Sequence, residues 1–116
     1  MTPEAREAQL KTAQDLFNQG EYWLAHEALE TVWRSISRER ADERLVWQGL
    51  IQACAALLHR SRGNRHGVVK VGASAVAKLA GPQCPEVEFE TVTFRGALTR
   101  ALAGEGDPPR LEWRTP

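Results

Sequence analysis

The stretch YWLAHEALETVW, residues 22–33, decides much of the fold when it is read with QGLIQACAALLHRSRGNRHG, residues 48–67. In the first stretch, apolar residues recur at the three- and four-residue spacing of one helix face, from Tyr22 through Leu29 to Trp33. The second stretch begins as a helix that is apolar nearly all round, which is typical of a central helix contacted on several sides. Two such helices, joined by a short polar loop, predict an all-α protein.

Helical signals extend along most of the chain. Thr2 before Pro3 is typical of a helix start, Gly20 of a helix end, and Gly63-Asn64 of one helix ending and the next beginning. The sequence predicts helices near residues 3–19, 21–37, 41–62, 65–80 and 90–103. Residues 104–116 contain Pro108-Pro109 and are expected to be extended and irregular. The predicted architecture is a single domain, residues 1–116, folded as an up-and-down bundle of about four to five helices with a C-terminal tail.

Composition narrows the classes of function. The chain has 116 residues and a net charge of zero, from 15 basic and 15 acidic side chains, so no overall field recruits nucleic acid. The longest apolar run, Leu50–Leu58, is interrupted by Gln52 and is too short to span a bilayer. The N-terminal residues lack a signal-peptide apolar region, and Cys54 and Cys84 lack a CxxC spacing. We therefore expect a cytoplasmic protein with reduced thiols that binds neither nucleic acid nor membrane.

The clearest chemical pattern is His26 followed by Glu30. Residues four apart are neighbours on a helix, so the imidazole and the carboxylate can share a ligand or bond each other. The helical wheel places His26 at the edge of the apolar face and Glu30 near its rim, whereas Glu27 points away from the core. His26-Glu27 resembles the start of the zinc-protease motif HExxH, but Glu30 stands where the second His is required.

A second polar stripe follows the central predicted helix. Gln48, Gln52, Ala55 and His59 recur at helical spacing, and antiparallel packing would turn this stripe toward His26. His26, Glu30 and His59 would then form a two-His, one-carboxylate set, which suits a divalent transition metal. Gln48 and Gln52 could orient these ligands by hydrogen-bonding to them.

The alternative is a site without a ligand. Buried polar side chains in helical bundles often bond one another and fix the register of the helices. On this interpretation His26 and Glu30 beside Trp33 form a structural network, and the protein is a non-enzymatic interaction module. Trp23, on the less apolar side of its helix, and Trp113 in the tail would then contact a partner protein or a second copy of the chain.

Basic residues also cluster at the turn between the third and fourth predicted helices. Arg60, Arg62, Arg65 and His66 lie near a helix N-terminus, where an anion can bind. The same pattern is typical of a solvated turn. The cluster has no interleaved aromatic residues, which is a further reason to expect no nucleic acid.

The segment FNQGEYWLAHEALETVW and the later QGLIQACAALLHRSRGNRHG resemble the all-helical domain-of-unknown-function family number 309. The resemblance rests on His-x-x-x-Glu-x-x-Trp, met by His26, Glu30 and Trp33, and covers about residues 16–67. It extends to further positions, which include Glu27, Gln48, Gln52, His59, Gly63, Asn64 and Gly67. The resemblance implies a compact helical bundle and a suspected metal role for the His/Glu motif, with no established reaction.

These patterns lead to one hypothesis with one alternative. The hypothesis is a divalent-metal site of unidentified metal, held by His26, Glu30 and His59, with Trp33, Gln48, Gln52 and Asn64 around it. If the site were catalytic, a metal-activated water with Glu27 or Glu30 as its base would be the expected device. The alternative is the structural or protein-interaction module, as a homo-oligomer or with a protein partner. The sequence identifies no substrate.

Overall fold

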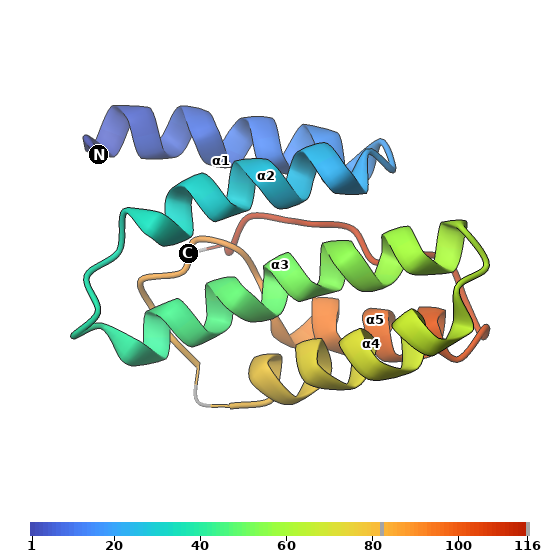
Figure 1. Cartoon of the computed structure of the whole chain (residues 1–116). Helices are drawn as coiled ribbons and strands as arrows, with labels where there is room; N and C mark the ends of the chain where they lie inside the picture. The colour runs from blue at the N-terminus through green and yellow to red at the C-terminus, as the bar shows by residue number, and fades with distance from the viewer. Residues whose placement is uncertain (82, 116) are drawn as a thin grey trace.

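Five α-helices make up the regular structure in the computed structural model, which describes residues 1–81 and 83–115 (Figure 1). Pro82, in the predicted loop, and Pro116, the last residue of the predicted tail, lie outside the described residues. The helices are α1 (Pro3–Asn18), α2 (Tyr22–Arg34), α3 (Ala41–Ser61), α4 (Arg65–Leu79) and α5 (Val92–Leu102). The predicted all-α fold class is confirmed.

Successive helices run in opposite directions, as expected for an up-and-down bundle (Figure 1). The central helix is α3, which lies between α2 and α4 and packs most extensively against α4. Its side chains Trp47, Leu50 and Leu57 are at most 1% exposed, as predicted from a helix that is apolar nearly all round. All five helices contribute to one continuous apolar core. Within the described residues, no helix has the length and apolar character needed to cross a membrane.

The residues that were predicted to start and end helices have the conformations and hydrogen bonds expected of them. Thr2 Oγ1 accepts a hydrogen bond from the amide of Ala5 and caps α1. Gly20 and Gly63 adopt positive φ angles of 84° and 70°, where a side chain would be strained. Asn64 Oδ1 then accepts from the Gly67 amide at 3.1 Å and starts α4.

Two predicted helix ends are wrong, and a side chain explains each difference. The second helix ends at Arg34 instead of near residue 37, because the chain turns so that Arg44 can donate to the carbonyl of Ile36 at 2.7 Å. The fifth helix begins at Val92 instead of near residue 90. Glu90 lies before it, and its carboxylate accepts from the amides of Val92 and Thr93, an acidic side chain at a helix N-terminus.

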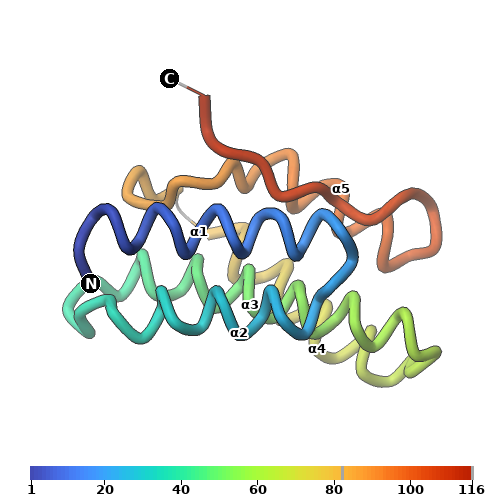
Figure 2. The backbone as a smooth tube through the Cα atoms, turned by 90° about the horizontal axis from the view of Figure 1, so that it is seen from above, coloured from blue at the N-terminus to red at the C-terminus, as the bar shows by residue number. Residues whose placement is uncertain are grey.

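From Asp107 onward the tail is extended, as predicted, and it lies along α1 (Figure 2). Leu111 is fully buried, and its carbonyl accepts from Gln14 and Asn18 of α1 at 3.0 Å each. Trp113 forms an isolated antiparallel bridge with Phe89, which ties the tail to the segment before α5. Trp113 is thus partly buried within the chain, and its contact with a partner stays a prediction.

Candidate functional site between α2, α3 and α4

The motif residues of α2 bond one another along the helix. His26 Nε2 lies 3.0 Å from Glu30 Oε1, and Arg34 Nη2 donates to Glu30 Oε2 at 2.7 Å. Both pairs are spaced four residues apart, the distance at which helix side chains meet. Glu30 therefore uses each carboxylate oxygen for a partner on its own helix.

Trp23 covers His26 on the outer side of α2. Their rings stack with centroids 5.0 Å apart and planes inclined by 9°, while Trp23 remains 53% exposed. This exposure was predicted. A shallow hollow of about 380 Å³ lies here, lined by Trp23, His26, Glu27, Glu30, Thr31 and Arg34. Glu27 is exposed at its rim.

A separate hollow lies between three helices, and the sequence had singled out most of its lining. It has a volume of about 300 Å³ and is lined by Glu30 and Trp33 of α2, Gln48, Ile51 and Gln52 of α3, and Lys78 of α4. We call it the α2–α3–α4 hollow. The structure thus brings Glu30, Trp33, Gln48 and Gln52 together.

Lys78 is the member of this hollow that sequence reasoning missed. Its ammonium donates to Gln52 Oε1 and to Ser74 Oγ, both at 2.9 Å. Because the oxygen of Gln52 accepts from Lys78, the amide nitrogen of Gln52 remains as a donor. The available signal was the one cation in the C-terminal part of α4, VGASAVAKL, which is otherwise built of small and apolar residues.

Trp33 is held beside the hollow by α3. The guanidinium of Arg44 lies 4.4 Å from the centroid of the Trp33 ring, and Arg44 also donates to the Trp33 carbonyl. The indole nitrogen of Trp33 is buried, and it has no hydrogen-bond partner among the described residues. Such a group is uncommon in a folded protein and calls for a physical explanation, such as a water or a ligand.

His59 belongs to another contact. Its Nδ1 lies 3.1 Å from Asn64 Nδ2, and its ring packs on Gly67, where an added Cβ would lie 2.5 Å from His59 Cγ. Because Gly67 has no side chain, α4 can pack closely against the imidazole of His59. His59 follows Gln52 by seven residues, which is roughly 10 Å along a helix.

The predicted three-ligand set is therefore not assembled. Across residues 1–81 and 83–115, no group of three or more His, Cys, Asp or Glu side chains is arranged to hold a metal ion. Glu30 pairs with His26 and Arg34, while His59 and Asn64 pair at the far end of α3. The donors present do not fit the predicted metal centre.

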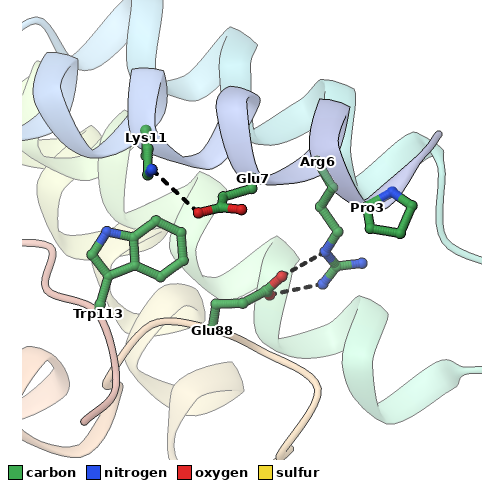
Figure 3. Close-up of a pocket in the computed structure, with 6 residues that line it drawn as sticks. All are labelled: Pro3, Arg6, Glu7, Lys11, Glu88 and Trp113. Atoms are coloured by element: carbon green, nitrogen blue, oxygen red, sulfur yellow. Dashed lines mark hydrogen bonds and ion pairs between the residues drawn. The ribbon is translucent and has the colours of Figure 1, made fainter.

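A larger hollow, of about 490 Å³, lies between α1 and the C-terminal segments (Figure 3). Its charged groups already form ion pairs: Arg6 donates to both oxygens of Glu88 at 2.7 and 2.8 Å, and Lys11 lies 3.2 Å from Glu7. The hydrogen bond to Glu88 raises the pKa of Arg6. The Trp113 indole on its wall donates to Gln14. These pairs leave the hollow without an uncompensated charge, so the α2–α3–α4 hollow is the better candidate site.

The family model described as Domain of unknown function (DUF309) matches residues 10–71. The chain belongs to the DUF309 family. The matched residues contain α2 and α3 and the start of α4, so they include every residue that lines the α2–α3–α4 hollow except Lys78.

A relative from Aquifex aeolicus (strain VF5), described as an uncharacterized protein, is 33% identical over 115 residues. The alignment covers 94% of this chain and 33% of the relative. The chain thus spans about a third of the length of this relative. Neither the description of the family nor that of this relative names an activity.

Proposed function

We propose that the protein is a non-enzymatic binding module, and that its α2–α3–α4 hollow takes a small molecule bearing a carboxylate. Lys78 is the observation that carries this proposal. Its hydrogen-bond partners, Gln52 and Ser74, are both neutral, and Lys78 forms no ion pair with any described residue. A fixed ammonium without a counter-charge favours an anionic ligand.

The rest of the lining supports the same ligand class. Gln48 and Gln52 add amide donors on the α3 side, and Ile51 adds an apolar wall. Glu30 is the one carboxylate in the lining, and its ion pair with Arg34 offsets its charge. A volume of about 300 Å³ is at the lower end for ligand sites. A small carboxylate, with its charge at Lys78 and its body against Ile51, suits this size.

The divalent-metal hypothesis has less support from the same contacts. A metal at His26 and Glu30 would have to displace their mutual bond and the Arg34 pair, and no third His, Cys, Asp or Glu of residues 1–81 and 83–115 completes the set. The proposal instead extends the alternative drawn from the sequence, a polar network in an interaction module. Self-association remains a further proposal, supported by the half-exposed, rigidly stacked Trp23.

Isothermal titration calorimetry with acetate and succinate tests the carboxylate site, with the Lys78→Met variant beside the unmodified protein. A charge-assisted hydrogen bond contributes about 1.5–3 kcal/mol. Lys78→Met is therefore expected to weaken binding by at least roughly tenfold. Lys70→Met is the matched control, because Lys70 is an exposed cation on the same helix that does not line the hollow. It should change the affinity by less than roughly twofold.

Two results would contradict the proposal. One is the absence of saturable binding of either carboxylate to the unmodified protein. The other is equal binding by the unmodified protein and a folded Lys78→Met variant. Circular dichroism establishes whether that variant is folded. If Lys78→Met is unfolded, Lys78→Arg provides the second test, since it keeps the charge and should retain saturable binding.

A further inference from the structure

Acidic residues are absent from one long part of the chain. All 15 Asp and Glu side chains lie outside residues 44–85, although the chain as a whole is neutral. The cations of this stretch have no acidic neighbours in sequence, except Arg44, which follows Glu43. They are Arg44, Arg60, Arg62, Arg65, Lys70 and Lys78.

The fold gathers several of these cations at the end of the molecule where α3 turns into α4. Arg60, Arg62, Arg65 and Lys70 are all exposed. None of them forms an ion pair with a residue in the part of the chain that the structure describes. This end of a neutral protein therefore carries an uncompensated positive potential.

An apolar groove lies within this positive end. It has a volume of about 410 Å³ and a floor of Val68, Val69, Leu102 and Ala103, contributed by α4 and by the end of α5. Arg60 and Arg65 line it as well. Val69 is 65% exposed, the largest exposed fraction among the large apolar side chains. We call this feature the α4–α5 groove.

We propose that the α4–α5 groove is a docking site for an acidic amphipathic segment of a partner protein. An apolar side chain of that segment would cover Val69 and Leu102, and its carboxylates would pair with Arg60 and Arg65. This is the helix-in-groove mode of recognition, with charge complementarity at the rim.

The apolar floor distinguishes this partner from other anions. A phosphate backbone or a phosphate ion would pair with the arginines but leave Val69 uncovered. Single-stranded nucleic acid also stacks its bases on aromatic side chains, and no aromatic residue lines the groove. A bilayer surface would meet the rim and leave the concave floor unfilled. A peptide can satisfy both the arginines and the floor.

The acidic side chains nearest in sequence to the groove are Glu105 and Asp107, which follow its last lining residue, Gly104. Neither forms an ion pair with Arg60 or Arg65 among the described residues. The groove shares no lining residue with the α2–α3–α4 hollow. The two proposals can therefore fail separately.

Fluorescence anisotropy with a labelled peptide of roughly 15 residues, built from Glu and Leu at helical spacing, tests the docking site. The double charge reversal Arg60→Glu/Arg65→Glu should weaken binding by roughly tenfold or more. Val69→Ser should weaken it by roughly threefold to tenfold. Arg38→Glu reverses one charge, half the change made by the double reversal, at an exposed loop residue outside the groove, and should leave the affinity unchanged within about twofold.

Several outcomes would overturn the proposal. The first is that the peptide does not bind saturably to the unmodified protein. The second is that the folded Arg60→Glu/Arg65→Glu variant binds the peptide as tightly as the unmodified protein does. Equal binding of a control peptide with Ser in place of Leu would show that the apolar floor is unused. Tighter binding of a short DNA duplex, lost in the same double reversal, would assign the end of the molecule to nucleic acid instead.

Discussion

Arg6 and Arg60 illustrate how differently two regions of this protein use their charges. Arg6, on α1, bonds Glu88 through two nitrogens and also pairs with Glu43, which is 2% exposed. Arg60, at the end of α3, is exposed and has no ion-pair partner among the described residues. The first region joins segments that are far apart in sequence. The second presents its charge to solvent.

This difference separates stability from recognition. Around Glu43, cations from α1 and from the loop before α3 meet a buried carboxylate, which also accepts from the Trp47 indole at 3.1 Å. Buried charges of this kind are costly to leave unpaired. Exposed cations contribute little to folding and remain available to a ligand. Substitutions in the two regions should therefore differ in kind.

The largest loss of stability is expected from Arg6→Met. Methionine keeps much of the apolar stem of Arg6 but leaves Glu43 and Glu88 without this cation, and breaking a buried pair costs about 3 kcal/mol. Urea denaturation measures the free energy of unfolding. Arg110→Met, which removes the exposed pair with Glu112, is the matched control and should cost less than about 0.5 kcal/mol. Equal losses in the two variants would remove the distinction between the regions.

Gly67→Ala comes next and tests the close contact of α4 with α3. A Cβ at Gly67 would lie 2.5 Å from His59 Cγ, so the imidazole must move and release Asn64. Overpacking of this kind costs about 2 kcal/mol. At Gly96, in α5, a Cβ would meet nothing within 4 Å. Gly96→Ala should therefore raise the free energy of unfolding by about 0.5–1 kcal/mol, because alanine favours the helix. If Gly67→Ala left the free energy of unfolding unchanged, the His59 ring would not depend on the missing side chain at residue 67.

Lys78→Met should have a smaller effect on stability than on binding. It removes two hydrogen bonds to neutral partners, which costs about 1 kcal/mol at a half-buried position. Thermal and urea unfolding measure this loss without ligand. A loss close to that of Arg6→Met would make Lys78 a structural residue and would weaken the case for a binding role.

Arg62→Ala should have the smallest effect. Arg62 is exposed and unpaired within the described residues, so its removal should change the free energy of unfolding by less than about 0.5 kcal/mol. Urea denaturation at low and high salt provides the measurement. A clear loss of stability at low salt alone would reveal an ion pair at this end that the structure does not show.

The sequence predicted the fold well because the signals for it are local. Helical periodicity, the Thr2 and Asn64 caps and the Gly20 and Gly63 ends each depend on a few neighbouring residues. The two helix ends that were wrong involve side-chain hydrogen bonds to the backbone, from Arg44 to the Ile36 carbonyl and from the Val92 amide to Glu90.

The candidate site could be predicted only in part. The helical wheel singled out Glu30, Gln48 and Gln52, which line the hollow, because their positions on α2 and α3 follow from periodicity. The separation of His59 from Gln52 follows from the seven residues between them on one helix. The contact of His59 with Gly67 could not be predicted, since it depends on how α4 approaches the end of α3. Lys78 comes from that same helix, so its place in the hollow also depends on tertiary packing.

An NMR titration of the ¹⁵N-labelled protein tests the central claim most directly, with succinate and Zn²⁺ added to separate samples. The account predicts that succinate saturably shifts the Gln48 and Gln52 side-chain amides and the Trp33 indole. It also predicts that stoichiometric Zn²⁺ leaves the ring nitrogens of His26 and His59 unchanged. The opposite pattern, with both imidazoles shifted by one equivalent of Zn²⁺ and no response to succinate, would contradict it.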